Sequence, residues 1–190
     1  PAHVSQTLDG SDICESGCAV EGLFAAGDYD RTVKASDSSF KVTKNFRLER
    51  GRGTSVLLVE NSDTESNRDL LPLNNDDRKV VTNARVRLVH AANAATQPVD
   101  VYRVDAGGSL NPDGTVREPL VSGLDYLGRS NYLPVPESTN HELVVTPAGT
   151  PGNELLRTSI TLEKGGNYRL IVAGDGNTDD VRLIQLGGVR

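Results

Sequence analysis

The feature that most constrains the fold of this 190-residue chain is an internal repeat. The tetrapeptide Leu-Glu-Arg-Gly at residues 48–51 recurs as Leu-Glu-Lys-Gly at residues 162–165, 114 residues later. At the same spacing, the apolar run at residues 56–59 aligns with residues 170–173. A repeat of this length predicts two related domains in tandem, each with its own core.

A second set of matches lies upstream, where residues 20–27 align with residues 121–128 at a spacing of 101. The two spacings differ by 13 residues, so the second copy carries an insertion. We place it in the turn at residues 147–152, because hairpin tips tolerate changes in length.

Each copy consists of short segments with the pattern of β-strands. Apolar and polar side chains alternate in residues 84–90, which is typical of a half-buried strand. The segment at residues 67–81 contains Pro72 and an acidic turn, so we interpret it as a strand and a linker rather than a helix. Short strands without a helical stripe predict an all-β sandwich. Further strands are expected at residues 99–104, 132–135, 143–146, 160–162, 168–173 and 181–186.

The two copies are not equally complete. We expect an incomplete first sandwich at residues 1–75, a linker at 76–82 and a complete second sandwich at 83–190, since no segment of the first copy corresponds to residues 84–92. A sandwich without that strand leaves backbone groups unpaired and a core face uncovered. Either sequence upstream of Pro1 supplies the strand, or a neighbouring molecule supplies it by β-augmentation, which builds filaments when it runs head to tail. Residues 1–9 are alternatively the donated arm.

The second copy carries the clearest family resemblance. Residues 86–91 (Val-Arg-Leu-Val-His-Ala) and 98–102 (Pro-Val-Asp-Val-Tyr) resemble the domain-of-unknown-function family 4397, a bacterial module. The chain departs from the family at Asn93, where a Ser-Pro-Asp turn is usual, and in the loop at residues 106–118. The resemblance implies immunoglobulin-like sandwiches, often in tandem, in exported or surface-anchored bacterial proteins. It assigns no catalytic residues.

Sulfur-containing residues bear on the compartment. The chain contains no Met, and we expect an N-terminal signal to have been removed from an extracellular or cell-surface protein; a fragment with an incompletely known N-terminus is the alternative. Cys14 and Cys18 are then predicted to form a disulfide across a short loop. Metal ligation and free thiols are the alternatives, although no second pair of Cys or His stands at a matching spacing.

Charge and motifs exclude several classes of function. The net charge of −6 disfavours a nucleic-acid binder, and no apolar run is long enough to insert into a membrane. Hydrolase, P-loop and dinucleotide-binding motifs are missing from the sequence, so we do not expect an enzyme. His90 lies within a predicted strand, and we interpret it as a hydrogen-bonded structural histidine rather than a ligand or a catalytic group.

A few residues remain as candidates for binding. Asp175, Asn177 and Asp179 present oxygen atoms at alternate positions and are weak calcium candidates, but Asp and Asn are also ordinary turn residues. No other metal or cofactor is expected. Arginine suits protein interfaces, and Arg50 and Arg52 flank Gly51 at a turn. The predicted interface residues are Ala2, His3, Val4, Arg50 and Arg52.

We therefore expect a non-enzymatic structural protein that assembles with itself into a fibre or filament by strand complementation. The alternative is an extracellular adhesion module that binds a glycan or a protein, and a calcium-supported hydrolase is third. Four tyrosines are candidates for stacking on a sugar, although tyrosine is also common in strands. They are Tyr102, Tyr126, Tyr132 and Tyr168.

Overall fold

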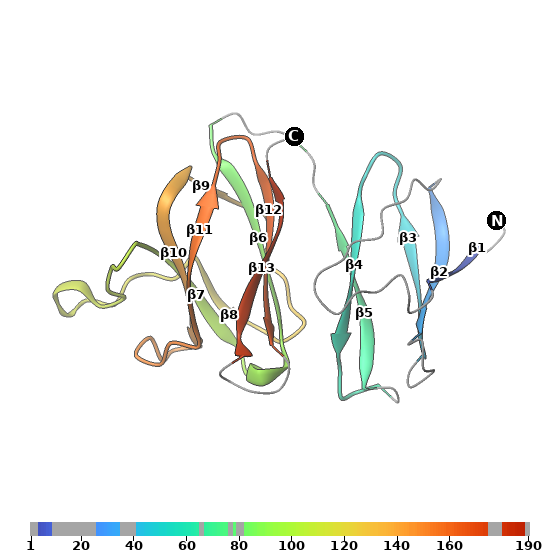
Figure 1. The fold of residues 1–190 in the computed structure, drawn as a ribbon, viewed down its shortest axis with the longest axis horizontal. Helices are drawn as coiled ribbons and strands as arrows, with labels where there is room; N and C mark the ends of the chain where they lie inside the picture. Colours follow the sequence, from blue (N-terminus) through green and yellow to red (C-terminus); the bar gives the residue numbers. More distant parts are fainter. Residues whose placement is uncertain are drawn as a thin grey trace. The chain divides into compact units, whose positions relative to one another are not determined.

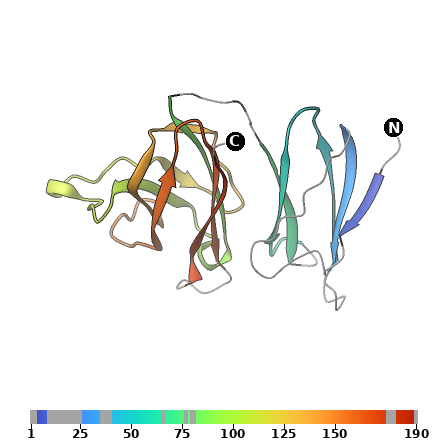
Figure 2. The same cartoon turned by 45° about the horizontal axis from the view of Figure 1, so that its top comes forward.

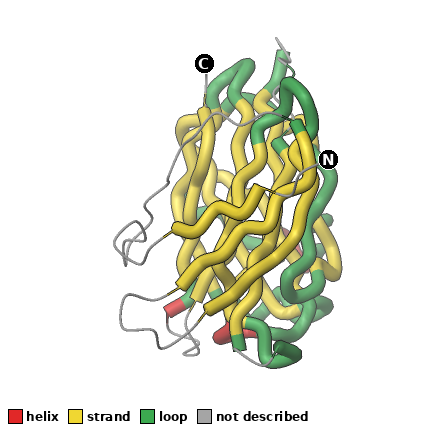
Figure 3. Tube along the Cα trace, turned by 90° about the vertical axis from the view of Figure 1, so that its right-hand side faces the viewer, coloured by secondary structure: helices red, strands yellow, loops and turns green. Residues whose placement is uncertain are grey.

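The fold is almost entirely β-structure. The computed structural model describes residues 4–8, 26–34, 41–64, 67–75, 78, 82–174 and 180–188. Within these residues every regular element is a strand except two single turns of 3-10 helix, Asn93–Ala95 and Pro112–Gly114 (Figure 3). The all-β prediction is confirmed. The chain divides into two compact units, Pro1–Asp77 and Arg78–Arg190, called here unit 1 and unit 2 (Figure 1). The division falls inside the stretch assigned to the linker.

Unit 2 is a sandwich of two four-stranded sheets. All strand pairs are antiparallel except β6 and β12, which run parallel. One sheet has the order β11-β10-β7-β8 and contains β7 (Val99–Asp105), β8 (Val121–Leu124), β10 (Ser138–Pro147) and β11 (Leu156–Leu162). The other has the order β13-β12-β6-β9 and contains β6 (Ala84–Ala92), β9 (Leu133–Val135), β12 (Asn167–Gly174) and β13 (Arg182–Gly188).

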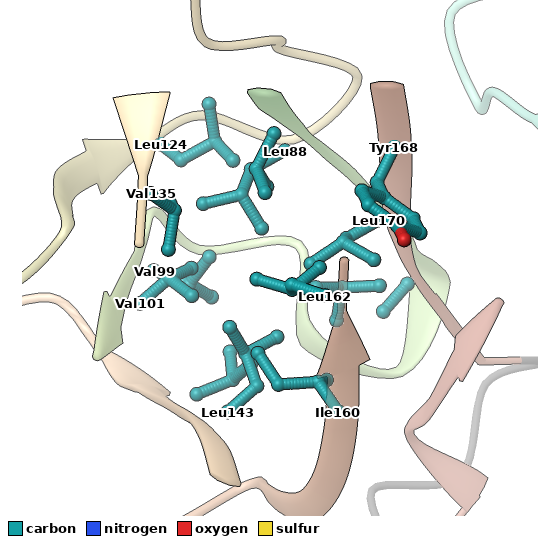
Figure 4. Close-up of a cluster of buried hydrophobic side chains, with 14 of the residues drawn as sticks. Leu88, Val99, Val101, Leu124, Val135, Leu143, Ile160, Leu162, Tyr168 and Leu170 are labelled. Atoms are coloured by element: carbon teal, nitrogen blue, oxygen red, sulfur yellow. The ribbon is translucent and has the colours of Figure 1, made fainter. Parts of the chain in front are cut away.

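The core of unit 2 lies between these sheets. Alternation along β6 turns Val86 and Leu88 inward, where both are fully buried. Leu170 from β12 and Leu143 from the opposite sheet meet them in the same cluster (Figure 4). β6 therefore contributes directly to the apolar interior, as well as pairing with β12.

Unit 1 also has two sheets, and both are smaller (Figure 2, blue to cyan for the first and teal for the second). The cluster of buried apolar side chains found in it contains Val33, Val42 and Leu70, with Val56 half-buried against them. Lys44 on one sheet forms an ion pair of 2.7 Å with Asp69 on the other. The strands are β1 (Val4–Leu8), β2 (Gly27–Lys34) and β3 (Lys41–Leu48) in the first sheet, and β4 (Thr54–Glu60) and β5 (Arg68–Asn74) in the second.

The sequence repeat is visible as matching strands. At a spacing of 114 residues, β3, β4 and β5 correspond to β11, β12 and β13, and the bounds of β5 and β13 correspond at every residue. The segment after residue 67, which contains Pro72, is a strand and not a helix, as predicted.

The predicted position of the insertion is wrong. Six residues join β2 to β3 and eight join β10 to β11, so the turn after β10 holds only two of the 13 additional residues. The others lie before β10, in the stretch that contains β9. β9 pairs with β6, with Ala84 opposite Val135. The inserted residues therefore include β9, which pairs with β6. β6 is the strand for which we found no counterpart in the first copy.

No helix in the described residues has the length and apolar character needed to cross a membrane.

Candidate functional site

The candidate site is one edge of strand β4. In unit 2 the corresponding strand, β12, lies between β13 and β6. In unit 1, β4 pairs with β5, and no strand in the described part of the chain pairs with its other edge. β4 thus corresponds to a central strand of unit 2, but among the described residues it has a neighbouring strand on one side only.

The hydrogen-bond pattern shows which backbone groups face that edge. The Asn75 N–H donates to the Gly53 carbonyl at 2.7 Å, and the Asn61 N–H donates to the Asn67 carbonyl at 3.0 Å, at the two ends of the β4–β5 ladder. Hydrogen-bonded and non-hydrogen-bonded pairs alternate along an antiparallel ladder. The pairs at even-numbered positions of β4 are therefore non-hydrogen-bonded, so residue 56 directs its N–H and C=O away from β5.

Pro72 fits this pattern. It lies opposite Val56 in the register of β4 and β5. Because that pair is non-hydrogen-bonded, the nitrogen of Pro72, which carries no hydrogen, faces the outer edge of β5. The proline therefore removes no hydrogen bond from the β4–β5 ladder, and it leaves the outer edge of β5 with one backbone donor fewer.

The outward positions of β4 match those that β12 uses to bind β6. The Arg85 N–H donates to the Gly166 carbonyl at 2.8 Å, which starts the parallel ladder. In a parallel ladder alternate residues of one strand face the partner, so Leu170 and Val172 face β6. Residues 56 and 58 are their counterparts, 114 positions earlier. The two units therefore point equivalent backbone groups towards the place of β6.

The turn before the edge is also the same in both units. Gly51 and Gly165 adopt left-handed backbone conformations, with φ of 72° and 77°, which glycine takes without a steric penalty. The Arg52 N–H donates to the Glu49 carbonyl at 3.3 Å, and the equivalent bond in unit 2 is 3.0 Å. The repeated tetrapeptide in the sequence is thus a repeated turn.

In unit 2 this turn receives the beginning of β6. The Gly165 N–H donates to the Asn83 carbonyl at 3.1 Å, one residue before β6 starts. Gly51 holds the same position in unit 1, at the start of the open edge of β4. The acceptor edge, defined here as residues 51–58 of unit 1, is therefore formed by the turn and the strand together.

Side-chain exposure follows the same division. Leu58 is 37% exposed, whereas its counterpart Val172 is fully buried. Val56 is half-buried, whereas Leu170 is fully buried. The described residues contain one other exposed large apolar side chain, Val116, in the loop after β7. The acceptor edge thus combines apolar side chains with outward backbone groups.

The predicted interface residues are brought together only in part. Arg50 and Arg52 both lie exposed in the turn at the start of the acceptor edge. Arg52 forms an ion pair of 2.8 Å with Glu49. Val4 begins β1, in the other sheet, so it does not join them. Ala2 and His3 lie outside the described residues.

His90 is a buried structural group, as expected from the sequence. Its Nε2 lies 3.2 Å from the Gln97 carbonyl, and its Nδ1 accepts a hydrogen bond of 3.4 Å from the Ala92 N–H. The ring meets Tyr126 edge-on, with centroids 5.6 Å apart. Burial lowers the pKa of His90 and outweighs the hydrogen bonds that raise it, so the ring is neutral near pH 7.

Asp100 is the buried charge that the sequence analysis did not single out. Its carboxylate accepts hydrogen bonds of 2.8 Å from the Gly123 and Gly149 N–H groups and one of 3.0 Å from the Ser122 hydroxyl. Burial raises its pKa, but these hydrogen bonds and one from Tyr102 outweigh it and leave the pKa lowered. Asp100 ties β8 and the turn after β10 to β7, which is a structural role. An acidic residue between apolar ones in Val-Asp-Val-Tyr was the available signal.

Two of the four candidate tyrosines are buried in the core. Tyr102 and Tyr168 are each 3% exposed, so neither presents a ring face to a ligand. Tyr132 lies under the guanidinium groups of Arg85 and Arg87, 4.9 and 4.2 Å from its ring centroid. The stacking hypothesis is therefore wrong for Tyr102 and Tyr168, whose rings the core requires.

Other candidates lie outside the described residues. These are the cysteines of the predicted disulfide and the predicted calcium ligands: Cys14, Cys18, Asp175, Asn177 and Asp179. In the corresponding loop of the first copy, the Asp63 N–H donates to the Asn61 side chain at 3.1 Å, as in an ordinary turn. The residues the structure does describe contain no cluster of His, Cys, Asp and Glu placed to hold a metal ion.

A scan against protein families and a search of curated proteins found no match to this chain.

Proposed function

We propose that this chain is an exported bacterial structural protein, at or outside the cell surface, that assembles with further copies of itself into a fibre by strand complementation. The observation that carries the proposal is the difference between β4 and β12. Equivalent strands point equivalent backbone groups outward, and a partner strand covers those of β12. The resemblance to family 4397 supports export and a non-enzymatic role.

Physical considerations favour occupation of the acceptor edge. A strand edge with unpaired backbone groups is a template for pairing with another chain. Natural proteins protect such edges with charges, prolines or bulges, whereas residues 54–58 of this edge include no charged residue and no proline, and carry Val56 and Leu58. Because the backbone groups are paired and the apolar area is buried in one step, addition of a strand stabilises unit 1.

A protein-binding adhesion module is the second candidate, because the same edge also accepts a strand from a different protein. The two proposals differ in what the purified chain does alone. Self-assembly requires no other component, whereas an adhesion module stays monomeric until its ligand is added.

The test measures the mass of the purified full chain by light scattering over a range of concentrations, with negative-stain imaging. We expect oligomers that grow with concentration. Leu58→Lys places a charge on the acceptor edge and should shift the chain towards monomer. Val116→Lys is the matched control, because it makes the same change at the other exposed apolar residue and should leave assembly unchanged. A wild-type chain that stays monomeric throughout would contradict the proposal.

A further inference from the structure

The geometry points to a specific strand on the acceptor edge: the N-terminal segment of a second copy, which contains β1 and runs parallel to β4 in the register that β6 has on β12. This inference rests on the proposed function and names the partner, the direction and the register that the proposal leaves open.

The direction follows from the repeat. β6 runs parallel to β12, with Val86 opposite Tyr168 and His90 opposite Val172. Shifted by 114 residues, these positions become Thr54 and Leu58. A strand running parallel to β4 meets the same outward N–H and C=O groups, in the same order, as β6 meets on β12.

The register follows from the turn. In unit 2 the Gly165 N–H binds the carbonyl just before β6, which sets the position of the first pair. Gly51 has the same backbone conformation, so its N–H is placed to bind the equivalent carbonyl of an incoming strand. A one-residue slip would replace Val4 and Leu8 on the core face by the polar Ser5 and Thr7, which opposes slippage.

β1 is the strand whose present pairing departs from the repeat. In unit 2 the neighbour of β10 is β7, and the two are antiparallel. In unit 1 the neighbour of β2 is β1, and the two are parallel. β1 therefore lies beside β2 without being the counterpart of β7. Releasing it leaves the β2–β3 and β4–β5 ladders intact, whereas releasing β6 would dismantle the core of unit 2.

The chain between β1 and β2 is long enough for an exchange between copies. Eighteen residues separate Leu8 from Gly27, and an extended chain of that length spans about 60 Å. The five residues of β1 cover the five positions from Thr54 to Leu58. In an extended strand, residues 4, 6 and 8 share one face, which places Val4 and Leu8 opposite Thr54 and Leu58, with the longer polar side chain of Gln6 opposite Val56 between them.

The experiment is photo-cross-linking between isotopically distinct copies of the full chain. A benzophenone amino acid is placed at Leu58 or at Thr54 of a ¹⁵N-labelled chain, which is mixed with unlabelled chain, irradiated and mapped by mass spectrometry. We expect both probes to capture residues 1–9 of the unlabelled copy. The Thr54 probe should reach residues nearer Val4, and the Leu58 probe residues nearer Leu8. The same probe at Val116 is the control and should capture no such peptide.

The outcomes separate the inference from the proposed function. If copies assemble but the Leu58 probe captures a different segment, or none, the named strand is wrong and self-assembly stands. If the two probes capture residues 1–9 in the opposite order, the strand is antiparallel and the inference fails. If mixed copies remain monomeric and yield no cross-link between labelled and unlabelled chains, the proposed function fails, and the inference fails with it.

Discussion

Units 1 and 2 share three consecutive strands at a constant spacing, and they differ in how much core those strands enclose. In unit 2, β12 is covered by β6, and Leu170 and Val172 are fully buried. In unit 1, β4 presents Leu58 to solvent. The comparison shows that one strand contributes twice, as the partner in a ladder and as a source of apolar side chains. Among the described residues, the buried apolar cluster of unit 1 is much smaller than that of unit 2.

The largest expected effect contrasts a buried leucine with its exposed equivalent. Leu88→Ala should lower the free energy of unfolding of unit 2 by about 3 kcal/mol, because Leu88 is fully buried in the core. Leu58→Ala should cost unit 1 less than about 1 kcal/mol in a monomeric sample, since no cavity forms at an exposed site. Hydrogen exchange on the full chain, read by mass spectrometry, reports each unit separately. Equal costs would mean that Leu58 is covered after all.

The second prediction concerns the buried carboxylate that unit 2 has on β7. Asp100→Asn should destabilise unit 2 by about 2 kcal/mol, because an amide cannot accept the same set of hydrogen bonds. Asp105→Asn is the control on the same strand, because its side chain is 75% exposed and the loss of its contact with His141 should cost little. Chemical denaturation followed by exchange in peptides of unit 2 measures both. If Asp100→Asn left the stability of unit 2 unchanged, the carboxylate would not be needed to hold the three segments together.

The stability of unit 2 should depend on pH because of His90, which has no counterpart in the described part of unit 1. The pKa of His90 in the folded state lies below its ordinary value of 6.5, so the unfolded chain takes up this proton first. Unit 2 should therefore keep its full stability above pH 6.5 and lose up to about 1.4 kcal/mol per pH unit below it. His90→Gln should remove that slope, whatever its cost at neutral pH. Thermal unfolding from pH 7.5 down to about pH 5, above the range where the carboxylates titrate, measures the slope. An unchanged slope in the variant would assign it to another group.

The smallest expected effect lies in unit 1. Lys44→Ala should cost about 0.5–1 kcal/mol, because the ion pair with Asp69 is only partly shielded from water. Arg47→Ala, whose charge lies 3.9 Å from Asp28 and is largely exposed, should cost nothing measurable. Urea titrations of the two variants compare them. A large loss for Lys44 would mean that this pair compensates for the small core of unit 1.

Sequence patterns predicted the strands well, since alternation reflects burial of one face. The strand at residues 68–74 was expected despite Pro72, and the repeat located its counterpart at residues 182–188. The insertion was misplaced because an alignment gap has no fixed position between matched blocks. The strand at residues 132–135 was expected, but its pairing with β6 was not. The parallel pairing of β1 and the hydrogen-bond donors to Asp100 depend on contacts between distant segments, which local patterns do not encode. Arg50 and Arg52 were found from composition, while the outward direction of residues 56 and 58 required the observed ladder.

Pro72 has a consequence for any assembly built from this chain. Its nitrogen carries no hydrogen on the outer side of β5, so that edge offers one backbone donor fewer than the β4 edge, and the proposed fibre is therefore built through β4. In the proposed fibre each subunit accepts a strand on its β4 edge and donates one to the next subunit, so all subunits have the same orientation. The two ends of such a fibre differ, and we expect different growth rates at each end.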